Sequence, residues 1–148
     1  MSLELTINEA IKTAMKAKDK VALDALRAVK SQLLLLKTEA KGAEVSAEQE
    51  IAIVQRMIKQ RKDSYEQFTA QNRADLAEVE LAQMKVIEQF LPAQLTEDEL
   101  KEAVAKIIAE IQASSLKDIG KVMGVATKTL AGQSDGKAIS EMVKHLLS

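Results

Sequence analysis

The sequence contains no cysteine and no tryptophan, and it has one histidine, His145, in 148 residues. Without cysteine, the chain has no disulfide scaffold, no thiolate chemistry and no cysteine zinc site. A single histidine excludes a multi-histidine metal site and argues against imidazole acid–base catalysis. These absences predict a protein with no metal, no cofactor and no catalytic residue of these kinds.

Proline and aromatic residues are almost as scarce. Pro92 is the only proline, and the aromatic side chains are Tyr65, Phe68 and Phe90. Residues with high helix propensity dominate the rest, and apolar residues nowhere alternate with a period of two. The sequence therefore predicts the all-α class.

The chain also lacks a long apolar run and a charge of one sign. No segment approaches the roughly 20 apolar residues that span a bilayer, and the first residues show no signal-peptide pattern. These features predict a soluble, cytoplasmic protein with no membrane partner. The 21 basic and 22 acidic residues give a net charge of −1. Any contact with a nucleic acid must therefore be local.

Apolar residues at helical spacing predict four helices before the proline. Their expected N-caps are Ser2, Asp19, Ser46 and Asn72, and their expected ends lie near Lys18, Lys41, Gln71 and Phe90. The fourth helix is expected to turn a stripe inward that consists of Leu76, Val79, Val86, Ile87 and Phe90.

Pro92 stops the fourth helix, because proline lacks the backbone N–H and constrains the preceding residue. Three further helices are expected, with N-caps at Thr96, Ser115 and Ser134. The sequence thus predicts a four-helix domain over residues 1–92 and a three-helix domain over residues 96–148. The expected hinge lies near Leu91–Thr96.

The predicted second helix carries two features that its core stripe does not explain. Four cations fall within a narrow sector of this helix: Arg27, Lys30, Lys37 and Lys41. This sector is either a solvated face or a strip that binds phosphates or an acidic partner. Leu34 and Leu35 diverge from the core stripe, so the helix is either central in the fold or a contact for a second chain.

The third helix places Arg61 on its apolar stripe between Ile58 and Tyr65. Burial of a lone guanidinium is very costly, so Arg61 needs a partner. We expect either an ion pair with an acid of a neighbouring helix or a groove that awaits a carboxylate or phosphate. Nearby Lys59 and Lys62 are expected to form i,i+4 ion pairs with Asp63 and Glu66.

Gly120 and Gly124 have a spacing that permits close approach of another backbone, either the last helix or a ligand. The segment Gly132–Ala138 superficially resembles a phosphate loop. It is too short between its glycines and follows a helix rather than a strand, which excludes a nucleotide site of that kind.

Several of these segments together resemble the YqeY family. They are Thr13–Asp19, Lys59–Ser64, Leu91–Leu95, Gly120–Gly124 and Asp135–Lys137. The second half also resembles the small helical domain that ends the B subunit of the glutamine-dependent aspartyl/glutamyl-tRNA amidotransferase, and a domain appended to some glutaminyl-tRNA synthetases.

The resemblance implies a non-catalytic module that binds tRNA or the complex that amidates mischarged aminoacyl-tRNA. The alternatives are a participant in glutamine-dependent amide transfer, of the carbon–nitrogen ligase class, and a helical protein-interaction module. The residues that the resemblance assigns to tRNA or anion binding are Gly120, Lys121, Gly124, Lys128, Asp135, Gly136 and Lys137. The chain departs from the family pattern at Gln133-Ser134, where Arg-Ala is common, and at Thr127, where proline is common.

Overall fold

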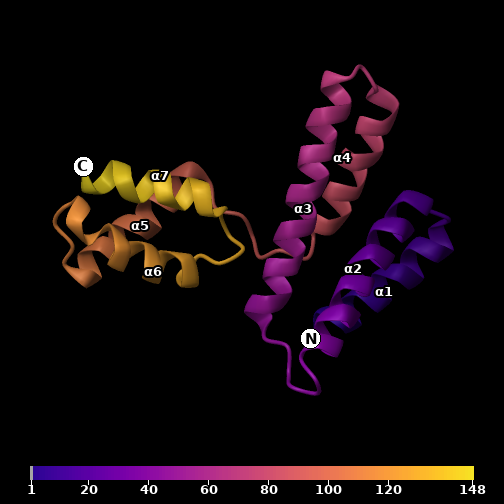
Figure 1. Cartoon of the computed structure of the whole chain (residues 1–148), viewed down its shortest axis with the longest axis horizontal. Helices are drawn as coiled ribbons and strands as arrows, with labels where there is room; N and C mark the ends of the chain where they lie inside the picture. Colours follow the sequence, from indigo (N-terminus) through magenta and orange to yellow (C-terminus); the bar gives the residue numbers. More distant parts are fainter. Residues whose placement is uncertain (1) are drawn as a thin grey trace. The chain divides into compact units, whose positions relative to one another are not determined.

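The computed structural model describes residues 2–148, which form seven α-helices, one 3₁₀ turn and no strand (Figure 1). The predicted all-α class is confirmed. The helices are α1 (Leu3–Ala17), α2 (Lys20–Glu39), α3 (Ala47–Ala70), α4 (Ala74–Glu88), α5 (Glu97–Ile111), α6 (Ile119–Thr129) and α7 (Gly136–Leu147), with the 3₁₀ turn η1 over Leu116–Asp118. Two compact units pack separately, with the boundary between Leu91 and Pro92.

Local sequence signals determine the first helix boundaries. The Ser2 and Asp19 side chains accept hydrogen bonds from the amides of Leu5 and Ala22, so both predicted caps are confirmed. α2 ends two residues earlier than predicted. Lys41 and Gly42 have φ values of +50° and +89°, which a right-handed helix cannot continue through.

Contrary to the sequence prediction, the turn between α3 and α4 does not use Asn72 as the N-cap of the following helix. Asn72 has φ +59° and belongs to the end of α3, where the Arg73 amide donates to the Phe68 carbonyl at 2.8 Å. This backbone pattern is that of a Schellman motif, in which asparagine tolerates the left-handed position. The N-cap position of α4 is therefore Arg73, which makes no side-chain cap hydrogen bond, and the predicted Asn72 cap is wrong.

The core of the first unit lies where α2 packs against both α3 and α4. Val29 of α2, Val54 of α3 and Ile87 of α4 are fully buried there. α1 adds Ile7 to this core, and Ala14 packs in a neighbouring cluster with Leu26. The predicted inward stripe is confirmed for Val86, Ile87 and Phe90, which pack in or against the core, but Leu76 and Val79 are exposed.

The second unit is a bundle in which α5, α6 and α7 each pack against the other two. Val104, Val122 and Val143, one from each helix, are fully buried. The capping box of Thr96 and Glu99 is present as predicted. Ser115 caps η1 through the Lys117 amide, so the predicted sixth helix begins as a 3₁₀ turn.

The last helix begins one residue later than predicted. The Asp135 side chain accepts a hydrogen bond of 2.7 Å from the Ala138 amide, so Asp135 is the N-cap instead of Ser134. An aspartate at this position also complements the positive end of the helix dipole.

Residues after Pro92 belong to the second unit. The backbone amide of Leu95 donates to the Gln133 carbonyl at 2.9 Å, and the side-chain amide of Gln94 donates to the Gly132 carbonyl. Both bonds attach this segment to the α6–α7 loop. Among residues 2–148, no helix is long and apolar enough to cross a membrane.

The two possible caps of α7 respond differently to alanine. We expect Asp135→Ala to lower the free energy of unfolding by about 1 kcal/mol, because the Ala138 amide loses its partner. Ser134→Ala should change it by less than about 0.5 kcal/mol. Urea denaturation of both variants measures the difference, and equal losses would contradict the Asp135 cap.

Candidate functional site

The outer face of α6 brings together three of the residues assigned to anion binding. At about 100° per residue, Lys121, Gly124 and Lys128 lie within a sector of about 60°. Burial of Val122 and Ala126 places the core side of α6 opposite this sector, and all three residues are exposed. The two lysines are about 10 Å apart along the helix axis.

The glycines of α6 face open space. A Cβ atom added to Gly120 or Gly124 would meet no other heavy atom within 4 Å. Close approach of α7 therefore does not explain them, and this alternative is wrong. Each glycine in a helix interior costs about 0.5–1 kcal/mol relative to alanine, so the missing side chains leave a shallow surface at a cost in stability.

Charges in the second unit are segregated by helix. α5 contains five acids, namely Glu97, Asp98, Glu99, Glu102 and Glu110, whereas α6 contains none. None of the three ion pairs in the described chain involves Lys117, Lys121 or Lys128. The Asp118 carboxylate, next to this face, accepts a hydrogen bond from the Ser114 amide at 3.0 Å. The α6 face is therefore locally cationic in a unit with no net positive charge.

The remaining assigned residues lie at the start of α7. Gly136 and Lys137 are exposed in its first turn, and Asp135 is occupied as its N-cap. Because α6 and α7 are antiparallel (Figure 1), Lys137 lies at the same end as Lys128 and at the opposite end from Lys121. The structure thus separates Lys121 from Lys137, and the residues that the resemblance assigns to anion binding do not form a single site.

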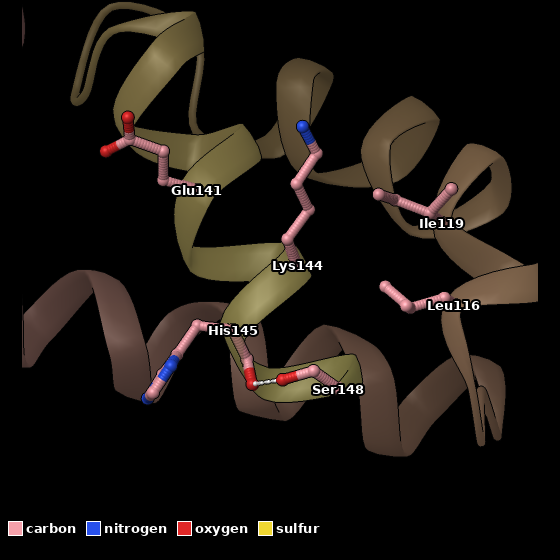
Figure 2. Close-up of a pocket in the computed structure, with 6 residues that line it drawn as sticks. All are labelled: Leu116, Ile119, Glu141, Lys144, His145 and Ser148. Carbon is pink, nitrogen blue, oxygen red and sulfur yellow. Dashed lines mark hydrogen bonds between the residues drawn. The ribbon is translucent and has the colours of Figure 1, made fainter.

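A shallow apolar groove lies at the Lys121 end, where α6 begins and α7 ends. Figure 2 shows Leu116 and Ile119 on one side of it and Lys144 beside them, while the His145 ring points away. The Ser148 hydroxyl donates to the His145 carbonyl at 2.8 Å. In the described residues, no three histidine, aspartate or glutamate side chains lie close enough to hold a metal ion.

Arg61 lies in the first unit with neutral partners. Its Nε donates to the Gln83 side-chain oxygen at 3.2 Å, and one terminal nitrogen donates to the Met57 carbonyl at 3.3 Å. The expected ion pair with an acid is absent from the described chain. Lys59 and Lys62 are exposed and also form no ion pair there, which corrects their expected pairing with Asp63 and Glu66.

The cations of α2 are partly engaged by α1. Lys37 forms an ion pair with Glu4, and Lys37 and Lys30 together lower the pKa of that carboxyl below its usual value. Leu34 and Leu35 are 48% and 52% exposed. These two leucines do not belong to the core, so a central position of α2 in the fold does not explain them.

These features define a small all-helical protein of two separately packed units. The YqeY family model, described as Yqey-like protein, matches residues 4–147. The chain therefore belongs to the YqeY family.

Curated relatives are similar over most of the chain. The protein named "Altered inheritance of mitochondria protein 41, mitochondrial" of Lachancea thermotolerans is 30% identical and covers 93% of this chain and 75% of its own length. The proteins of the same name from Pyrenophora tritici-repentis and Candida glabrata are 26% and 27% identical. They cover 93% and 92% of this chain, and 76% and 72% of their own lengths.

The names of these relatives correct one expectation from the sequence. Each name includes the word mitochondrial, which conflicts with a purely cytoplasmic location.

Replacing Gly124 by alanine tests whether this glycine serves the fold. We expect Gly124→Ala to stabilise the second unit by about 0.5–1 kcal/mol, because helix propensity rises and no clash arises. The matched control, Gly132→Ala, should destabilise by about 1 kcal/mol, because Gly132 has φ +79°. Urea unfolding followed by the α6 amide signals measures both, and a loss for Gly124→Ala would contradict the open face.

Lys37→Ala should return the pKa of Glu4 towards its ordinary value. Because the folded pKa is depressed, the pair stabilises the fold above the unfolded pKa, and this contribution is lost as pH falls through the folded pKa. The variant should therefore differ from the wild type at neutral pH and match it in acid. An NMR titration of Glu4 with pH-dependent melting measures both effects, and an unchanged Glu4 pKa would refute this assignment.

Proposed function

We propose that this protein is a non-catalytic module that binds tRNA as an accessory to aminoacyl-tRNA amidation. The observation that carries the proposal is the exposed α6 face, where Lys121 and Lys128 lie on either side of Gly124. The link to amidation rests on the family resemblance of the second half of the chain.

The chemistry of this face suits a phosphate backbone. Lysine ammonium groups attract phosphates as point charges, and unpaired lysines do not first have to leave a carboxylate. Because glycine has no side chain, a phosphate backbone can approach α6 more closely at Gly120 and Gly124 than it could at any other residue. Such a contact recognises the shape and charge of a folded RNA and not its base sequence.

The composition supports the same mode of binding. Base stacking uses exposed aromatic rings, and His145 carries the only such ring in the described second unit, because Tyr65, Phe68 and Phe90 all precede Pro92. Gln133 replaces the arginine that is common in the family and contributes its carbonyl to the Leu95 amide. We therefore expect modest affinity with a strong dependence on salt.

Filter binding of unmodified tRNA to the full chain tests the proposal. Lys121→Ala with Lys128→Ala should weaken binding and lower the slope of log affinity against log salt by about 1 per lysine. Gly124→Glu should weaken it further, because it adds bulk and negative charge at the centre of the face.

The matched control is Lys101→Ala with Lys106→Ala. These exposed lysines lie on α5, so the net charge changes equally while the α6 face stays intact. The control should bind as the wild type does. If both double variants lost the same amount of tRNA affinity, net charge alone would explain the loss, and a site on α6 would be contradicted.

The enzymatic alternative is tested on the same preparation. Glutamine-dependent amide transfer releases ammonia from glutamine and consumes Glu-tRNA. We expect neither activity from the chain alone, and ammonia release above background in purified protein would favour the enzyme.

A further inference from the structure

An apolar seam runs along α4, and other helices of the chain pack against only part of it. Leu76, Val79, Val86 and the polar Gln83 of α4, together with Phe90 just beyond its end, recur at alternating intervals of three and four residues, which is the a/d spacing of a helix–helix seam. Val86 and Phe90 pack against the cluster that holds Ala14 and Leu26. Leu76 and Val79 are 36% and 42% exposed, so the N-terminal half of the seam has no such cover.

The shape of the first unit explains why this half is uncovered. In the apolar clusters that include α1 and α2, α3 contributes residues up to Ile58 and α4 contributes residues from Val86 onward. Beyond them, α3 and α4 continue as a hairpin to their connecting turn, visible at its free end in Figure 1. Ala77 of α4 is 3% exposed, and α3 and α4 pack extensively against each other.

Arg61 places a cation beside this exposed half. Its guanidinium reaches Gln83, the third member of the seam after Leu76 and Val79, and within residues 2–148 it binds only neutral oxygens. The second terminal nitrogen of its guanidinium makes no hydrogen bond in the described structure. A half-buried guanidinium with neutral partners is most favourably completed by a carboxylate, which accepts two parallel hydrogen bonds.

We propose that the seam of Leu76, Val79 and Gln83 docks an acidic amphipathic helix of another protein. Two apolar side chains of that helix, three or four residues apart, cover Leu76 and Val79, and an aspartate or glutamate about one or two turns away pairs with Arg61. This surface lies in the first unit and does not depend on the proposed tRNA face of α6.

A display library of 15-residue helical peptides, selected on the full-length chain, tests the proposal without presupposing helix direction. We expect enriched peptides to carry the apolar pair and the acid. Changing that acid to its amide should weaken binding roughly tenfold, as for a partly desolvated charge pair. Val79→Glu should abolish binding, whereas Leu5→Glu, at a residue of similar exposure on α1, should leave it unchanged.

Gln83→Glu separates the charge effect from a loss of folding. It supplies Arg61 with an internal carboxylate, so we expect the melting temperature to hold or rise while the preference for acid over amide disappears. A preference that persists in this variant, or enriched peptides that bind Val79→Glu equally well, would refute the proposal.

Two other occupants are distinguished by further measurements. A wild-type dimer in light scattering that Val79→Glu converts to a monomer would assign the seam to a second copy of the chain. A loss of tRNA affinity in Arg61→Gln with unchanged peptide binding would assign the guanidinium to RNA. Either result would overturn the proposed helical partner, and peptide binding without either result supports it.

Discussion

The mutual burial of Val104, Val122 and Val143 determines which side of α6 meets water. Each valine comes from a different helix of the second unit and is fully buried. Because a helix residue advances by about 100°, burial of Val122 and Ala126 turns Lys121, Gly124 and Lys128 outward together. The candidate site is therefore a direct consequence of the core, since the same periodicity that buries one side of α6 exposes the other.

In the first unit, core burial likewise determines which side of α4 is exposed, but here the exposed side includes apolar residues. Ile87 anchors α4 in the core with Val29 and Val54, and this orientation leaves Leu76 and Val79 exposed. Arg61 adds a guanidinium whose partners there are neutral. The two units thus present different chemistry: α6 carries cations beside open glycines, and α4 carries an apolar seam beside the guanidinium of Arg61 from α3. These are suited to a phosphate backbone and to a protein helix, respectively.

Sequence signals predicted helix boundaries well where one side chain makes the decisive hydrogen bond. Ser2, Asp19, Ser46 and Thr96 are such cases, because a cap acts within three residues of itself. The predictions at Asn72 and Ser134 were wrong by one position. At Ser134 the neighbouring Asp135 is also a good cap, whereas Asn72 takes the left-handed position that ends α3.

The sequence by itself determined that the chain is helical and which residues share a helix face, because these properties depend on local periodicity and composition. Its motifs also carried the resemblance to the YqeY family. Only the tertiary structure decided that Lys121 and Lys137 lie at opposite ends of an antiparallel pair, that Arg61 meets Gln83 instead of an acid, and that Leu76 and Val79 are exposed. Each of these depends on where one helix packs along another. Helical periodicity specifies an angle around an axis but not the position along a neighbour at which packing ends.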